Sequence, residues 1–118
     1  MDDERFRKLV TEAIDSLPSE FLSKLNNVAV TVEEEPTAEK LQKLRLHPQT
    51  LLFGLYEGVP QAKRSNYSGV LPDKITIFKN SIEKVARNDQ EIRIQIRATL
   101  IHEIGHHFGF SEGDLKGR

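Results

Sequence analysis

The sequence predicts an α+β fold in a single domain that spans residues 1–118. Three observations predict it. Both ends of the chain place apolar residues at the three- and four-residue spacing of one helical face. Between them, three short segments carry the alternating or concentrated apolar residues that are typical of strands. The length of 118 residues is that of one ordinary domain, and no linker, internal repeat or low-complexity tract divides it.

The first half is expected to hold three helices and one strand. A first helix is predicted at about residues 2–17, and Pro18 suits the first turn of a short second helix. The apolar positions of the first helix are Phe6, Leu9, Val10, Ala13, Ile14 and Leu17. Valine at every second position over residues 28–32 predicts a half-buried strand. Thr37 is then expected to cap a helix that runs to about Leu46.

The middle of the chain predicts two more strands and a long connection. Residues 50–56 read as a mostly apolar strand, in which Gly54 indicates a bulge or the close approach of another backbone. Residues 61–73 are rich in small, polar and charged side chains, which predicts a long surface loop. A third strand follows over residues 74–78, and Ser81 is expected to cap a short helix.

Composition excludes several classes of function. The chain has 17 Lys+Arg against 18 Asp+Glu, so it lacks the basic field of a nucleic-acid binder and we expect no nucleic-acid partner. No apolar run approaches the roughly 20 residues of a membrane span, so we expect no membrane partner and a cytoplasmic location. Because there is no cysteine, only His, Asp and Glu side chains are available as metal ligands.

The last predicted helix, at about residues 89–108, carries the motif with chemical meaning. Residues 102–106 read H-E-x-x-H. Residues four apart lie one turn apart on the same helical face, so His102 and His106 can converge on one metal ion. Glu103 lies about 100° further around the helix. It is therefore placed to act as a general base on a water molecule rather than as a third ligand beside both histidines.

A helical wheel places this motif relative to the core. Apolar residues fill about half of the circumference. They are Ile92, Ile94, Ile96, Leu100, Ile101, Ile104 and Phe108. The two motif histidines fall outside this arc, on the side of Gln95, Ala98 and Thr99, and are expected to face a cleft or a neighbouring strand. Glu103 lies at the edge of the arc. His107 projects into it between Ile96 and Leu100, so we expect a packing residue rather than a ligand.

The third metal ligand is expected after the helix. Gly109 is placed to supply a left-handed turn, and the pattern extends to H-E-x-x-H-x-x-G-x-x-E, in which Glu112 replaces the last histidine of the metzincin spacing. Glu112 is the first candidate for the third ligand, and Asp114 is the second. Water or a group from a partner is the remaining alternative.

These residues resemble the minimal zincin-like metallopeptidases, a small bacterial family also called minizincins. The resemblance rests on residues 102–109, which read His-Glu-Ile-Gly-His-His-Phe-Gly, and on residues 54–60, 67–75 and 77–78. It implies a minimal zincin-like core, in which a short three-stranded mixed sheet packs against helices that include the C-terminal H-E-x-x-H helix. It also implies Zn²⁺ held by the two motif histidines and a carboxylate near Glu112.

The leading hypothesis is a zinc-dependent metallopeptidase with His102, His106 and Glu112 as metal ligands and Glu103 as general base. Its substrate would be a peptide or protein, aligned by strand addition to either residues 51–56 or residues 74–78. The first candidate donor to the oxyanion is Tyr67, followed by Tyr56 and Arg64. The alternative role for Tyr67, which we favour, is that of a loop anchor packed on the core.

The alternative hypothesis is a catalytically inactive zincin-like binding or adaptor module whose cleft is completed by a partner protein. Met1 is the only methionine, so no Met-turn of the metzincin kind can support the metal site. We also expect no second lobe to form the other wall of a cleft.

Overall fold

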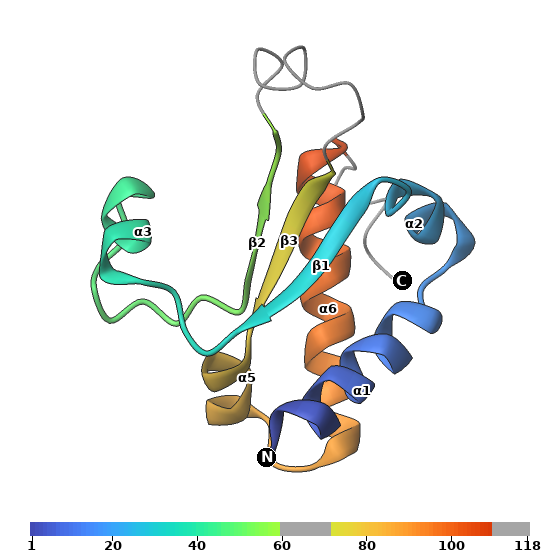
Figure 1. The fold of residues 1–118 in the computed structure, drawn as a ribbon, viewed down its shortest axis with the longest axis horizontal. Helices are drawn as coiled ribbons and strands as arrows, with labels where there is room; N and C mark the ends of the chain where they lie inside the picture. The colour runs from blue at the N-terminus through green and yellow to red at the C-terminus, as the bar shows by residue number, and fades with distance from the viewer. Residues whose placement is uncertain (60–71, 110–118) are drawn as a thin grey trace.

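The computed structural model describes residues 1–59 and 72–109 and confirms the α+β fold with a three-stranded mixed sheet (Figure 1). In chain order its elements are α1 (Asp3–Asp15), α2 (Ser19–Lys24), β1 (Val28–Glu33), α3 (Ala38–Lys43), β2 (Gly54–Glu57), β3 (Asp73–Phe78), α5 (Lys79–Val85) and α6 (Asp89–His107). The strand order is β1-β3-β2, with β1 parallel and β2 antiparallel to β3. Among the described residues, no helix is long and apolar enough to cross a membrane.

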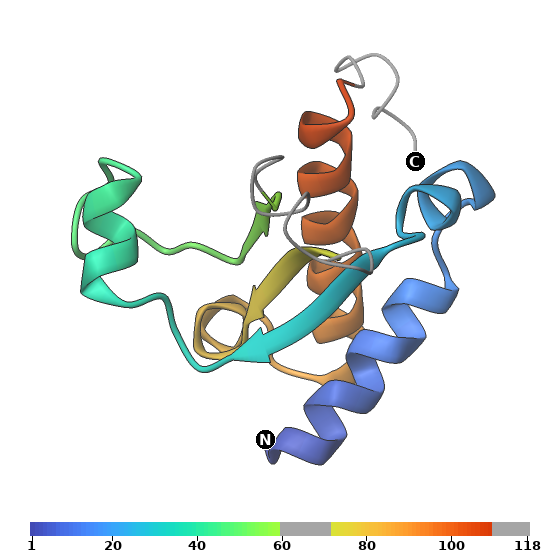
Figure 2. The same cartoon turned by 45° about the horizontal axis from the view of Figure 1, so that its top comes forward.

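The core lies between the sheet and the two longest helices. Helix α6 lies against one face of the sheet and α1 packs on α6, whereas α3 stands away from the sheet on the side of β2 (Figures 1 and 2). Both Ile75 and Ile77 of β3 are fully buried, and the valines of β1 pack half-buried beside them. From α1 the core takes Phe6, Leu9, Val10 and Ala13. The predicted apolar faces of these elements are therefore confirmed.

Three predicted element ends are wrong. The regular part of the second strand begins at Gly54 rather than at residue 50, and α3 ends at Lys43 rather than near Leu46. Arg45 adopts a left-handed backbone conformation with φ of 59°, through which α3 cannot continue. Ser81 caps nothing, because β3 continues directly into α5 and Ser81 is buried inside that helix.

A buried lysine joins the start of α5 to the start of α1. Lys79 Nζ donates to Asp3 Oδ1 at 2.9 Å, and the lysine side chain is only 9% exposed. This hydrogen bond, followed by the positive charge of Lys79, lowers the pKa of Asp3. The hydrogen bond with Asp3 likewise raises the pKa of Lys79.

The lowered pKa of Asp3 predicts a loss of stability in acid. A carboxyl group whose pKa is lower in the folded chain stabilises the fold above its unfolded pKa of about 3.9 and loses that contribution as the pH falls through the folded value. The free energy of unfolding should therefore fall less steeply below about pH 4 in Asp3→Asn than in the wild type. Urea unfolding across this range measures the difference. Glu4→Gln is the control, because Glu4 is exposed in the same helical turn; an equal change in both variants would contradict the prediction.

Candidate functional site

Helix α6 buries one face in the core and exposes the two motif histidines on another. Its buried residues are Ile92, Ile96, Thr99, Leu100, Ile101, Ile104 and Gly105. His102 and His106 are both exposed. The predicted apolar arc is wrong at Phe108, which is 38% exposed, and at Ile94, which is 59% exposed. Ile94 lies at the margin of that arc and lines a surface groove between α1 and α6 instead of the core.

The two motif histidines lie side by side. Their ring centroids are 4.1 Å apart and their planes are tilted by 38°. Neutral imidazoles are common zinc ligands, and two exposed imidazoles one turn apart on one helical face supply two donors of such a set.

Glu103 points toward the sheet rather than along the histidine face. It is half-buried, and its Oε1 accepts a hydrogen bond from the backbone N–H of Tyr56 in β2 at 3.0 Å. Among the described residues, no hydrogen bond holds Oε2. The carboxylate is thus fixed by one oxygen beside the two histidines.

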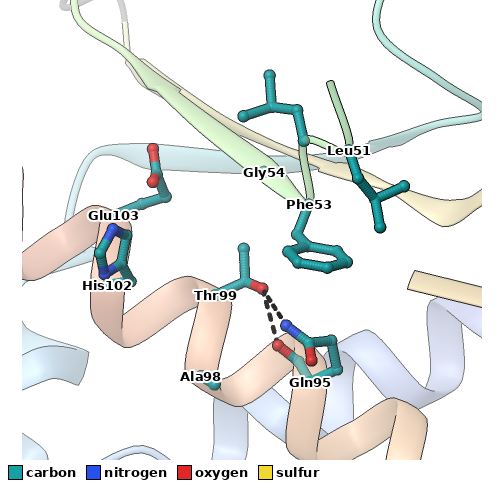
Figure 3. A pocket seen from close by; sticks show the side chains of 9 residues that line it. Leu51, Phe53, Gly54, Gln95, Ala98, Thr99, His102 and Glu103 are labelled. Atoms are coloured by element: carbon teal, nitrogen blue, oxygen red, sulfur yellow. Dashed lines mark hydrogen bonds between the residues drawn. The ribbon is translucent and has the colours of Figure 1, made fainter. Parts of the chain in front are cut away.

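A pocket of about 400 Å³ lies directly beside these groups (Figure 3). One wall is formed by residues 51–54 and the other by α6. The lining residues from α6 are Gln95, Ala98, Thr99, His102 and Glu103. His102 therefore shares its side of the helix with the three residues that the wheel predicts, and it faces a strand across a cleft. Leu51, Leu52 and Phe53, which no motif singled out, make the opposite wall mostly apolar.

Gly54 allows β2 to lie this close to α6. A Cβ atom at residue 54 would lie 2.6 Å from Thr99 Cγ2 and 3.1 Å from the carbonyl oxygen of Thr76. Both distances are shorter than ordinary contacts between such atoms. The close approach predicted at this glycine is therefore confirmed, and the partner that most restricts residue 54 is a side chain of α6.

Gly54→Ala is expected to destabilise the fold by about 1–3 kcal/mol, because the added methyl group must push β2 away from α6. Urea unfolding measures the loss. In the background of Thr99→Ser, which removes Cγ2 but keeps the hydroxyl that donates to Gln95 at 2.8 Å, part of the loss should disappear. An unchanged loss in that background would show that Thr99 is not the obstacle.

His107 packs on β2 and not in the core. It is exposed, and its ring stacks on Tyr56 with centroids 3.8 Å apart and planes 15° apart. Its expected place between Ile96 and Leu100 is therefore wrong, because α6 ends at His107, beyond the core that covers those residues. The hydroxyl of Tyr56 donates to Asp73 Oδ2 at 2.8 Å, so its single proton is committed and does not serve as the expected oxyanion donor.

The predicted third ligands lie outside the described residues, as do the first and third candidate oxyanion donors. These four are Glu112, Asp114, Tyr67 and Arg64. Within residues 1–59 and 72–109, no group of three or more His, Asp or Glu side chains is arranged to hold a metal ion. Gly109 has a φ of 77° after the end of α6, so the predicted left-handed conformation at this glycine is present.

The strand order distinguishes between the two segments that were expected to align a peptide substrate. Residues 74–78 belong to β3, which is paired on both sides and therefore offers no free edge. That candidate is wrong. β2 is an edge strand, and it is the one that borders the pocket and Glu103.

Comparison with known proteins gives one match. A family model described as a zincin-like metallopeptidase matches residues 25–118, and no curated protein matches the chain. The matched segment includes all three strands and α6, and it extends further toward the N-terminus than the sequence resemblance, which covers the chain from about Leu51 onward. It leaves out α1, which nevertheless contributes a large part of the core.

Proposed function

The chain belongs to the zincin-like metallopeptidases, and on that premise we propose that it is a zinc-dependent peptidase whose reaction centre lies on the last two turns of α6. One observation carries the proposal. His102 and Glu103 line a pocket whose far wall leads into β2, and the His106 ring lies against the His102 ring one turn further along α6. This arrangement supports a metal site, a proton acceptor and a place for a peptide close to one another.

His102 and His106 would hold the zinc ion, with Glu112 as the proposed third ligand. Their exposure, spacing and neutral imidazole chemistry support this assignment. Bound zinc would polarise the carbonyl of the scissile peptide bond and lower the pKa of a water molecule toward about 7.

Glu103 would move the proton. Its Oε1 is held by the N–H of Tyr56, so Oε2 is the atom proposed to accept a proton from the attacking water and to deliver it to the leaving amine. Partial burial of Glu103 between α6 and β2 limits the rotamers that the carboxylate can adopt. A proton acceptor held in one orientation is what general base catalysis requires.

A peptide substrate would lie along β2. The open edge of β2 offers the backbone groups of Gly54 to an extended chain, and the pocket beside Gly54 can take one of its side chains. Because the walls include Leu51, Phe53 and Ala98, an apolar side chain is favoured over a charged one. The proposed substrate class is therefore an extended peptide with an apolar residue next to the cleaved bond.

Metal stoichiometry tests the proposal. The wild type is expected to bind one zinc ion, and His102→Ala or His106→Ala should weaken zinc binding by more than about 100-fold, beyond the effect of losing an outer-shell partner. Glu112→Ala should weaken it as well, and Asp114→Ala should not. His107→Ala is the matched control, because His107 is on the same helix but stacks on Tyr56. Zinc content near zero after zinc is supplied, or equal losses in all three histidine variants, would overturn the assignment.

A further inference from the structure

The backbone of β2 alternates between groups that pair with β3 and groups that face the open side. Gly54 lies opposite Ile77 and Tyr56 opposite Ile75 in the antiparallel ladder. The N–H of Phe78 donates to the carbonyl oxygen of Phe53 at 2.9 Å, so residue 53 is at a hydrogen-bonded position. Because such positions alternate, residues 55 and 57 also bond to β3, and Gly54 and Tyr56 direct their backbone groups to the open edge.

The hydrogen bond to Glu103 agrees with this pattern. The N–H of Tyr56 points away from β3 and donates to Glu103 Oε1 at 3.0 Å. A carboxylate from α6 therefore lies on the open edge of β2 and occupies one of the donors that an added strand would use. Two residues earlier in β2, the N–H of Gly54 faces the same edge and lies beside the pocket.

Two side-chain contacts hold Tyr56 in place and thereby fix the position of its backbone N–H. Its ring stacks on His107 and its hydroxyl donates to Asp73 of β3. Glu103 and His107 are four residues apart, so they lie one turn apart on α6. The N–H of Tyr56 contacts the first of them and its ring contacts the second. The neighbouring Glu57 adds an ion pair with Lys40 of α3 at 2.6 Å.

We propose that the backbone N–H of Tyr56 is a positioning group for the proton acceptor Glu103, and that the same contact ends the stretch of β2 to which a peptide can pair. The proposal rests on the proposed peptidase function. An extended substrate pairs with both backbone groups of Gly54, and it leaves the edge at Tyr56, where Glu103 already holds the N–H. The bond to be cleaved thereby comes to lie beside the carboxylate rather than further along the strand.

Two substitutions at residue 56 isolate the N–H. Tyr56→Pro removes both the N–H and the ring, whereas Tyr56→Ala removes the ring and keeps the N–H. Proline is tolerated at edge positions whose N–H does not pair within the sheet, and the extended conformation of the preceding Leu55 is the one that proline favours. The difference between the two variants therefore reports on the hydrogen bond to Glu103.

Kinetics on a fluorogenic peptide that the wild type cleaves, chosen from a mixed-sequence library, give the first readout. Relative to Tyr56→Ala, Tyr56→Pro should lower kcat by about 10- to 100-fold, the usual effect of one hydrogen bond to a charged group, with KM and zinc stoichiometry unchanged. Unchanged zinc stoichiometry would show that the folded fraction is equal in the two variants, so a loss of stability would not explain the lower kcat. Equal kcat in the two variants would overturn the proposal. If the wild type cleaves no peptide, the proposed function is wrong. Amide hydrogen exchange then still tests whether the N–H of Tyr56 donates to Glu103.

Amide hydrogen exchange of the zinc-free chain gives the second readout and needs neither substrate nor Tyr56→Pro. The Tyr56 amide should exchange at least about 10-fold faster in Glu103→Ala than in the wild type, because its acceptor is removed. The Leu55 amide, which pairs with β3, should be unchanged and serves as the internal control. An unchanged rate at Tyr56 would show that Glu103 does not hold this N–H.

Discussion

Glu103→Gln is expected to lower peptide hydrolysis by about 10²- to 10⁴-fold, the usual contribution of a general base, with zinc stoichiometry unchanged. The glutamine Oε1 can still accept the hydrogen bond from Tyr56 N–H, so the position of the side chain and the fold are kept. The amide nitrogen that replaces Oε2 cannot accept a proton. The variant therefore separates proton transfer from metal binding and from packing. Values of kcat/KM and zinc content, measured on the same preparations, provide the test.

The same variant distinguishes the peptidase from the adaptor alternative. An inactive module that is completed by a partner protein should lose neither metal nor partner binding when Glu103 becomes glutamine. His47→Ala is a useful control for activity, because it removes an exposed imidazole that accepts a hydrogen bond from the backbone N–H of Gln49 and lies outside α6 and β2. A peptidase activity that survives Glu103→Gln at more than about one tenth of the wild-type rate would contradict the role that we assign to Glu103.

Much of the fold could be predicted because most elements bury one face along their whole length. The three- and four-residue spacing in α1 and the alternation in β1 both report on the core that they contact. The errors fall where tertiary contacts override local signals. Ser81 has the chemistry of a cap, but β3 runs into α5 without a loop. Ile94 is apolar, but no element of the described chain covers it.

The candidate site could be predicted only in part. The spacing of His102 and His106 is a property of one helix, so the sequence contains it completely. The hydrogen bond from Tyr56 to Glu103 joins residues 47 positions apart through a backbone N–H, which every non-proline residue has and which leaves no mark in the sequence. Gly54 was the one local signal of this contact, since it indicated that another element approaches β2 at this point.

Ile104→Ala is expected to lower the free energy of unfolding by about 2–5 kcal/mol, the range for truncating a buried isoleucine. Ile104 is fully buried, although it stands inside the H-E-x-x-H motif between exposed and half-buried side chains. Stabilities of single domains are about 5–15 kcal/mol, so the loss would be a large share of the total. Urea unfolding of the zinc-free chain measures it without any contribution from metal binding.

Ile94→Ala is the matched control, because it removes the same atoms from the same helix at a position that is 59% exposed. Its effect should stay within about 0.5 kcal/mol. If the two variants lost equal stability, Ile104 would not anchor the motif in the core. The expected difference would show that Ile104 anchors this turn of α6 in the core. With that face buried, His102 and His106 are exposed and Glu103 is directed toward β2, so Ile104 supports the turn that carries the proposed reaction centre.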